Sequence, residues 1–212
     1  MRQNLRRMIA LLLMLFLFTG PNAHLEEQEA WMLTLVNSDH PLPEDYEVTD
    51  LVEVRGGQKV DRRIYPALQA MFDAARAAGL SVVVRSGYRT RKQQETLLVN
   101  RYKEYRNKGY SDQEAREAAL SWVAYPGTSE HEAGLGLDIN AGSGSSKEKV
   151  YAWLAKNAWK YGFILRYPNG TSEITGIIYE PWHYRYVGVD AATQIVKLGI
   201  TFEEYYAYYV ER

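Results

Sequence analysis

The chain has 212 residues, of which 46% are hydrophobic and 24% charged, which is enough for one substantial core, and no internal break suggests two domains. The formal net charge is -1 and the basic residues are scattered, so the composition does not favour a nucleic-acid partner. The chain has no cysteine, which excludes disulfides, cysteine ligands, a cysteine nucleophile and a lipid-modified N-terminal cysteine.

The N-terminus has the pattern of a secretory signal. Three arginines within the first seven residues precede an apolar run from Ile9 to Phe18, which is too short for a comfortable membrane span. Residues 21–23 (Pro-Asn-Ala) are not a clean cleavage site, so an uncleaved membrane anchor remains an alternative. We expect a signal peptide or N-terminal anchor at 1–23, a linker at 24–30, and a domain at 31–212 that works outside the cytoplasm, either secreted or anchored to a membrane.

The first half of the domain mixes helices with one strand. Apolar residues recur at helical spacing before Gly79, and a β-branched run follows it. Ser111 and Glu114 form a capping box at the start of a later helix. The predicted elements are, in order, an irregular arm at 41–45, a helix at 63–78, a strand at 80–84, a loop at 86–90, a helix at 91–108 and a helix from Ser111.

The second half has the composition of a small sheet with helices. Short apolar runs alternate with Gly, Pro and Ser punctuation, which favours strands joined by loops. The predicted elements are a loop at 125–128, a strand at 135–139, a loop at 142–146, a helix ending near 161, strands at 163–165 and 177–179, and helices after 190 and 201. The fold class is therefore α+β: a single domain with a small, mostly antiparallel sheet that carries the motifs, and helices packed around it.

Two short blocks contain side chains that bind metals well. His131 and Asp138 lie in the first, and Glu180 and His183 lie in the second; the other two of the chain's four histidines are near the N-terminus. Two imidazoles and one carboxylate are a ligand set of zinc hydrolases, which leaves a fourth position open for water and a further carboxylate to act as base. The blocks therefore indicate metal-assisted hydrolysis.

Pro181 limits how the second block can be built. Proline disfavours a helical arrangement of Glu180 and His183, so the pair is expected on extended chain. Residues three apart on an ideal strand face opposite sides, and a shared cavity therefore requires a bulge or bend near Pro181.

These blocks resemble the VanY-type D-alanyl-D-alanine carboxypeptidases and, more widely, the zinc peptidase group that includes VanX-type dipeptidases and L,D-carboxypeptidases. The resemblance covers roughly Trp31 to the C-terminus. The group's pattern Ser-x-His-x-x-Gly-x-Ala-x-Asp matches residues 129–138, with Gly136 in place of the usual alanine, and Glu-x-x-His matches residues 180–183. The resemblance implies one Zn²⁺ bound by three ligands: His131, Asp138 and His183.

The same resemblance implies the other site residues. Glu180 would be the base, and Arg89 matches the arginine of the family's Ser-Gly-Tyr-Arg-Ser stretch, which holds the substrate near its scissile carbonyl. Gln94 and Ser129 match a glutamine and a serine that lie beside the bound peptide, and Trp182 is expected to contact the substrate. The two residues after Arg89 depart from the family stretch, which concerns fine specificity rather than the reaction.

The expected function is zinc-dependent hydrolysis of the terminal D-Ala-D-Ala bond of peptidoglycan stem peptides by a monomer. With zinc activating a water molecule, Glu180 would take the proton as the water attacks the carbonyl, and would then give it to the leaving amine. Arg89 would hold the oxyanion or the terminal carboxylate of the peptide. Gly87 is expected to let this loop approach the substrate closely.

Three alternatives remain beside this function. An L,D-carboxypeptidase acting on tetrapeptide stems would use the same residues. A zinc-stabilised, non-catalytic cell-wall binding module would not need Glu180, because a structural zinc tends to close its fourth position. A serine enzyme of the Ser-x-x-Lys type at residues 146–149 lacks the accompanying motifs, and Ser145 with Glu148 is better interpreted as a capping box.

Overall fold

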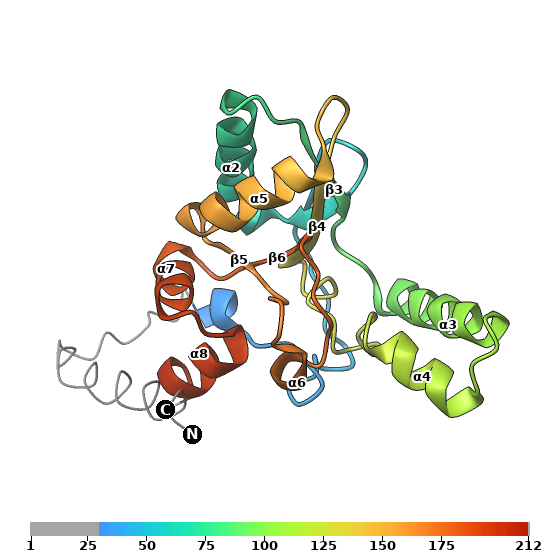
Figure 1. Cartoon of the computed structure of the whole chain (residues 1–212). Helices are drawn as coiled ribbons and strands as arrows, with labels where there is room; N and C mark the ends of the chain where they lie inside the picture. Colours follow the sequence, from blue (N-terminus) through green and yellow to red (C-terminus); the bar gives the residue numbers. More distant parts are fainter. Residues whose placement is uncertain (1–29, 212) are drawn as a thin grey trace, which may run out of the picture. The chain divides into compact units, whose positions relative to one another are not determined.

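The computed structural model describes residues 30–211, so the predicted signal or anchor and most of the predicted linker lie outside the described residues. Residues 32–212 form one compact unit, which contains the sheet and the helices labelled in Figure 1. Within the part of the chain that is described, no helix combines the length and the apolar character needed to span a membrane.

The elements follow the predicted order closely. The strands are β1 (Leu51–Glu53), β2 (Lys59–Asp61), β3 (Val82–Ser86), β4 (Gly136–Ala141), β5 (Phe163–Leu165) and β6 (His183–Tyr186). The α-helices are α2 (Tyr65–Ala77), α3 (Arg91–Asn107), α4 (Asp112–Leu120), α5 (Lys147–Asn157), α6 (Ser172–Thr175), α7 (Val189–Leu198) and α8 (Phe202–Tyr209). Short 3₁₀ turns lie at η1 (Ala30–Leu33), η2 (Arg62–Ile64) and η3 (Ala158–Tyr161). The fold is the predicted single α+β domain.

The main sheet has four antiparallel strands in the order β3-β4-β6-β5, and β1 and β2 form a separate hairpin. The two central strands, β4 and β6, each contain part of one sequence block. Their register pairs Asp138 directly with His183. Because side chains alternate along a strand, Leu137 and Ile139, both fully buried, lie on the opposite face of the sheet from Asp138.

Helices surround this sheet at different positions. α5 packs against β4 and α2 packs against β3, while α3 and α4 lie side by side as a helical hairpin away from the strands (Figure 1). The capping box predicted from sequence explains where the hairpin's second helix starts. The Ser111 side chain accepts from the Glu114 N–H, and the Glu114 side chain accepts from the Ser111 N–H.

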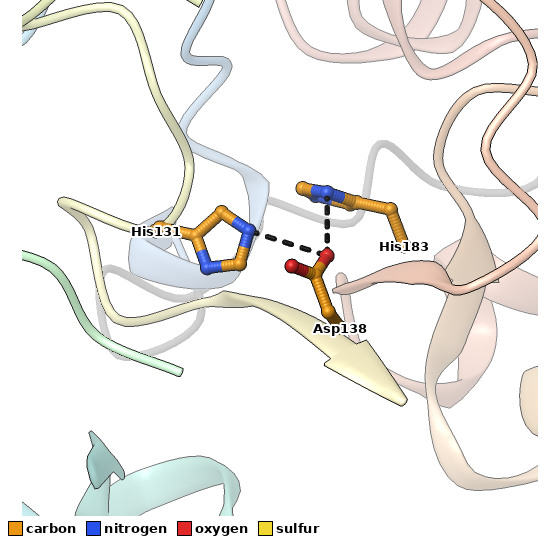
Figure 2. Close-up of side chains that lie close together, drawn as sticks. All are labelled: His131, Asp138 and His183. Carbon is orange, nitrogen blue, oxygen red and sulfur yellow. Dashed lines mark ion pairs between the residues drawn. The ribbon is translucent and has the colours of Figure 1, made fainter. Parts of the chain in front are cut away.

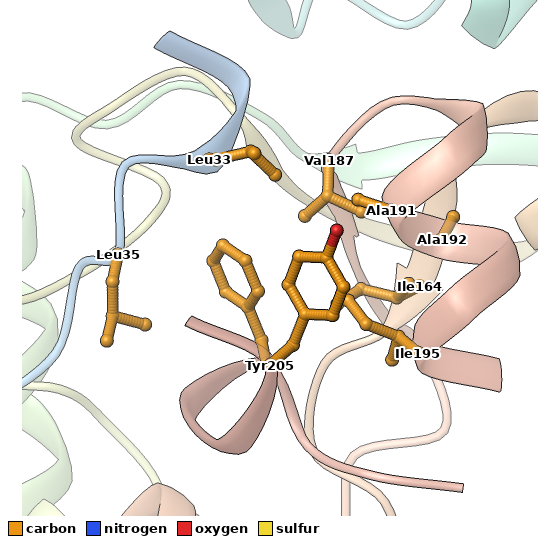
Figure 3. Packing of buried hydrophobic residues seen from close by; sticks show 9 residues of the cluster. Leu33, Leu35, Ile164, Val187, Ala191, Ala192, Ile195 and Tyr205 are labelled. Atoms are coloured by element: carbon orange, nitrogen blue, oxygen red, sulfur yellow. The ribbon is translucent and has the colours of Figure 1, made fainter. Parts of the chain in front are cut away.

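A cluster of buried apolar side chains, called here the terminal cluster, packs chain segments from both ends of the unit against each other. It joins an N-terminal arm at residues 33–35, β5, the residue after β6, α7 and α8: Leu33, Leu35, Ile164, Val187, Ala191, Ala192, Ile195, Phe202 and Tyr205. In Figure 3, the Tyr205 side chain of α8 lies between the arm and α7. The arm is thereby packed against the domain, which makes it part of the fold.

Two predictions about secondary structure and helix caps were wrong. Residues 177–179 do not form a strand, because the Ile178 N–H donates to the Ser121 carbonyl at the end of α4, at 3.0 Å, instead of joining the sheet. Ser145 does not cap α5, because its hydroxyl accepts from the Ser81 N–H. The cap is Ser146, whose hydroxyl accepts from the Lys149 N–H.

Candidate metal centre and substrate cavity

Three side chains from the two blocks meet at one point. His131 Nε2 lies 3.5 Å from Asp138 Oδ1, and His183 Nδ1 lies 3.4 Å from the same oxygen. The two imidazole rings are nearly perpendicular, at 87°, and their centroids are 4.9 Å apart. Figure 2 shows both rings converging on the Asp138 carboxylate. One ligand atom from each residue lies within 4.8 Å of the others.

Strand pairing fixes the positions of two of these residues, and a turn places Glu180 beside them. Asp138 and His183 are register partners on β4 and β6. The His183 N–H donates to the Glu180 carbonyl at 3.1 Å, so residues 180–183 form a β-turn with Pro181 at its second position, where proline is favoured. This turn is the bend that the sequence required, and it brings the Glu180 carboxylate to 3.4 Å from His183 Nδ1.

The ring of His131 is oriented by a backbone carbonyl. His131 Nδ1 lies 2.7 Å from the Gly87 oxygen, and because a carbonyl only accepts, Nδ1 carries the proton and Nε2 keeps a free lone pair toward Asp138. A side chain at residue 87 would place its Cβ 2.1 Å from the Lys59 oxygen. Gly87 therefore allows close approach to the backbone of β2, and not to the substrate as the sequence suggested.

The electrostatics favour the ligand form of two of the three residues. Burial, together with the nearby Arg89 charge, lowers the pKa of His131 to about 4, so its ring is neutral at neutral pH. Burial alone would raise the pKa of Asp138, but the adjacent imidazoles hold it well below its usual value. Burial opposes a charge on His183, yet the nearby carboxylates of Asp138, Glu130 and Glu180 raise its pKa well above its ordinary value.

The arrangement fits a zinc ion. Tetrahedral zinc with ligand bonds of about 2.0–2.1 Å separates two ligand atoms by about 3.3 Å, close to the spacings around Asp138 Oδ1. His131 Nε2 and Asp138 Oδ1 are buried and have no hydrogen-bond partner among the described residues, which is costly unless a cation satisfies them. Two nitrogens and one oxygen are a catalytic zinc set with one position left open.

The cluster lies in the wall of a cavity of about 290 Å³. The predicted base and the predicted substrate-binding residues line the same cavity: Glu180, and Arg89, Gln94, Ser129 and Trp182. The backbone N–H of Arg89 donates to the backbone carbonyl of His131 at 3.1 Å, so the loop that carries Arg89 is bonded to the loop that carries His131. Among the described residues, Arg89 Nε is buried without a hydrogen-bond partner, and burial lowers the pKa of this guanidinium despite the Asp138 and Glu180 charges.

One amide and two aromatic side chains form part of the cavity wall. Gln94 is 1% exposed, and its amide N–H donates to the Ala124 carbonyl at 2.7 Å, which leaves its own oxygen without a partner in the described chain. Trp182 stacks on Trp122 with ring centroids 6.3 Å apart, and both line the cavity. This wall offers flat apolar surface and one amide acceptor to a bound peptide.

Sequence reasoning missed several residues around the cluster. Tyr167 lines the cavity with its ring centroid 4.8 Å from that of His183, and Trp122 supplies half of the aromatic stack. Behind the cluster, Glu130 forms fully buried ion pairs with Arg166 and Arg185. The one available signal was charge itself, because Glu130 stands inside the first block between two residues with predicted roles.

Comparison with known proteins identifies relatives across nearly all of this unit. The family model described as VanY, D-alanyl-D-alanine carboxypeptidase, matches residues 57–189. A D-alanyl-D-alanine carboxypeptidase of Enterococcus faecalis is 50% identical over 181 residues, which cover 85% of this chain and 67% of that protein. The putative carboxypeptidase YodJ of Bacillus subtilis is 40% identical over 191 residues, covering 82% of this chain and 67% of that protein.

Solved structures of similar proteins superpose on most of this chain. VanYB in complex with D-alanine-D-alanine superposes with a TM-score of 0.82 at 48% identity, covering 86% of this chain and 99% of that one. A vancomycin-resistance D,D-pentapeptidase VanY variant in complex with Zn(II) gives 0.80 at 50% identity, covering 82% and 98%. The LD-carboxypeptidase LdcB gives 0.68 at 37% identity, covering 82% and 84%.

Proposed function

Since the chain belongs to the VanY family of D-alanyl-D-alanine carboxypeptidases, we propose that it hydrolyses the terminal D-Ala-D-Ala bond of peptidoglycan stem peptides with the help of one zinc ion. The observation that carries this proposal is the convergence of His131, Asp138 and His183 on one point in the wall of a cavity. These three would be the zinc ligands. Zinc bound there supplies a Lewis acid that activates water and polarises a carbonyl.

Glu180 is the acid/base group of this proposal. Its carboxylate lines the cavity 3.4 Å from His183 Nδ1, so it lies beside the ligand set without being needed to complete it. From there Glu180 accepts the proton of the attacking water and then donates it to the leaving amine of the terminal D-alanine. A purely structural zinc site has no use for such a spare carboxylate, which argues against a non-catalytic binding module.

Arg89 binds a negatively charged group of the substrate or of the reaction intermediate. Its backbone N–H bonds to the His131 carbonyl, and its side chain lines the cavity with Nε unpaired in the described chain. A planar fork of N–H donors suits either the terminal carboxylate of the peptide or the oxyanion formed during attack. Gln94, Ser129 and Trp182 contact the peptide on the other walls of the same cavity.

A second candidate reaction has specific support. The LD-carboxypeptidase LdcB is 37% identical, and its fold superposes over most of this chain. Removal of D-alanine from a tetrapeptide stem would use the same ligands and the same base, but the residue before the cleaved bond would be an L-amino acid in place of D-alanine. The 50% identity to a D-alanyl-D-alanine carboxypeptidase favours D,D-specificity.

The remaining assignments follow from the substrate. Peptidoglycan lies outside the cytoplasm, so we propose that residues 1–23 export the domain as a cleaved signal peptide or hold it at the membrane as an anchor, with a linker at 24–30. The domain at 31–212 would then act on the cell wall as a monomer.

Three synthetic stem peptides, each incubated with the purified protein, test this function. They end in D-Ala-D-Ala, in D-Ala-D-lactate, and in one D-Ala after an L-centre, and each is assayed with chelator and after zinc is restored. We expect mass spectrometry to show loss of one D-alanine from the first peptide, abolished by chelation and recovered with zinc. Cleavage of the third peptide alone would establish the L,D-reaction instead. No cleavage of any peptide by the zinc-loaded protein would contradict both.

A further inference from the structure

Glu130 is a buried carboxylate directly behind the metal cluster. Its side chain is 0% exposed, and it stands between Ser129 and His131 in the first sequence block. One of its oxygens, Oε1, accepts from Arg166 Nε at 2.7 Å and from Arg185 Nη1 at 2.9 Å. Two guanidinium groups therefore hold this one oxygen, and the carboxylate has little freedom to rotate.

The second oxygen of Glu130 points at a ligand. Oε2 lies 3.7 Å from His183 Nε2, which is the ring nitrogen turned away from Asp138. Both atoms are buried and neither has a hydrogen-bond partner among the residues described. Two unpartnered buried polar atoms that face each other are a costly arrangement unless they pair.

Metal binding through His183 Nδ1 determines that the other ring nitrogen, Nε2, carries the proton. When the lone pair of Nδ1 is given to a cation, a neutral imidazole carries its proton on Nε2 and can only donate there. The available acceptor is Glu130 Oε2. The present separation exceeds a hydrogen bond of about 2.7–3.2 Å, so a shift of about half an ångström closes the contact.

The surroundings keep Glu130 in reach of the ring. Arg166 also pairs with Glu203, through Nη1 at 2.9 Å and Nη2 at 2.5 Å, and Arg185 Nη2 donates to the Thr34 carbonyl at 2.7 Å. On the other side, a Cβ on Gly136 would lie 2.9 Å from Glu130 Cβ and 3.2 Å from His183 Nε2. The glycine that replaces the family's usual alanine leaves β4 without a side chain against this contact.

We propose that Glu130 is a positioning residue for the zinc site: its Oε2 accepts the Nε2 proton of His183, which fixes the tautomer and the direction of Nδ1 toward the metal. This inference rests on the proposed zinc site. Partners of this kind orient metal-binding histidines and raise their basicity, and their loss typically weakens metal binding by about 10–100-fold. A merely structural Glu130, present only to neutralise two arginines, would leave zinc affinity unchanged in a folded variant.

The test compares Glu130→Gln with Glu203→Gln. Both substitutions remove a carboxylate from Arg166, but only the first changes the group that faces His183. In Glu130→Gln, the new amide oxygen stays with the arginines, so the amide NH₂ group meets a donor at His183 Nε2. Zinc dissociation constants are measured by competition with a chromophoric chelator, on protein whose fold is checked by circular dichroism. We expect about 10–100-fold weaker zinc binding for Glu130→Gln and less than about 3-fold for Glu203→Gln.

Equal zinc affinity in the wild type and Glu130→Gln, or equal losses in the two variants, would overturn the inference while leaving the proposed function intact. A wild-type protein that binds no zinc would overturn both. If Glu130→Gln does not fold, ¹⁵N NMR of the zinc-loaded wild type decides: a hydrogen-bonded His183 Nε2–H that exchanges slowly with water supports the inference, and rapid exchange overturns it.

Discussion

Asp138 and His183 are register partners on adjacent antiparallel strands, and Asp138 Oδ1 lies 3.4 Å from His183 Nδ1. Backbone hydrogen bonds of the sheet therefore hold two of the three candidate ligands at ligand spacing. His131 reaches the same oxygen from a loop, and the Gly87 carbonyl orients its ring. Sites built on strands keep their geometry better than sites built only on loops, which suits a catalytic metal.

Removal of either imidazole should abolish zinc binding. We expect His131→Ala and His183→Ala to retain less than about a tenth of the wild-type zinc, because two protein ligands do not complete a site that needs three. Zinc per protein is measured by elemental analysis after gel filtration. His40→Ala is the control, since His40 contacts Asn37 and lies outside the cluster, and it should keep full occupancy. Full zinc content in both site variants would rule out the ligand assignment.

Glu180→Gln should separate catalysis from metal binding. The amide keeps the shape of the side chain but cannot take a proton, so we expect kcat to fall by about 10²–10⁴-fold while zinc stays bound. Kinetics on a peptide ending in D-Ala-D-Ala and zinc analysis of the same sample check both parts. Glu173→Gln, at an exposed carboxylate of α6, should be unaffected. An unchanged kcat for Glu180→Gln would mean that the base lies elsewhere.

Arg89→Lys should lose most of kcat/KM although the positive charge is kept, because lysine cannot donate two parallel hydrogen bonds from one plane. Arg85→Lys makes the same chemical change at an exposed position of β3 and serves as the control. If Arg89 contacts the transition state, kcat falls with kcat/KM, whereas an anchor for the substrate carboxylate mainly raises KM. Near-native kcat/KM for Arg89→Lys would show that another group holds the peptide.

Substitutions in the terminal cluster of apolar side chains should affect stability and not chemistry. Ile195 is 5% exposed within it (Figure 3), so Ile195→Ala should lower the free energy of unfolding by about 2–5 kcal/mol through lost burial and a residual cavity. The neighbouring Val196 is 44% exposed, and Val196→Ala should change the stability far less. Urea unfolding measures both, and zinc content should match the wild type in each. A loss below about 1 kcal/mol for Ile195→Ala would show that the cluster contributes little.

Much of the fold could be predicted from local sequence signals. Gly79 and Gly162 follow helical segments and both adopt positive φ, and the Ser111 capping box begins α4 as expected. The ends of a strand depend on its pairing with neighbouring strands and not on composition alone. For this reason β3 begins at Val82, two residues after the predicted start at Leu80. Residues 177–179 have strand composition, but they bond to the end of α4, and this is a long-range choice that no local pattern reveals.

Some residues of the candidate site could also be predicted from the sequence, and others could not. Spacing and residue type marked both histidines of the blocks together with Asp138 and Glu180, and Pro181 correctly indicated a bend before His183. The pairing of Glu130 with Arg166 and Arg185 joins positions far apart in the chain, so sequence spacing provides no hint of it. Trp122 was missed for the same reason, because its stacking partner Trp182 lies on another part of the chain.

The binding of one zinc ion by His131, Asp138 and His183 is the feature on which the proposed reaction depends. Anomalous X-ray diffraction at the zinc absorption edge, from crystals of the zinc-loaded protein, tests it most directly. We predict a single strong peak about 2.0–2.2 Å from His131 Nε2, Asp138 Oδ1 and His183 Nδ1, with the fourth position open to the cavity. A peak bound by other residues, or a site in which Glu180 closes the fourth position, would contradict this assignment.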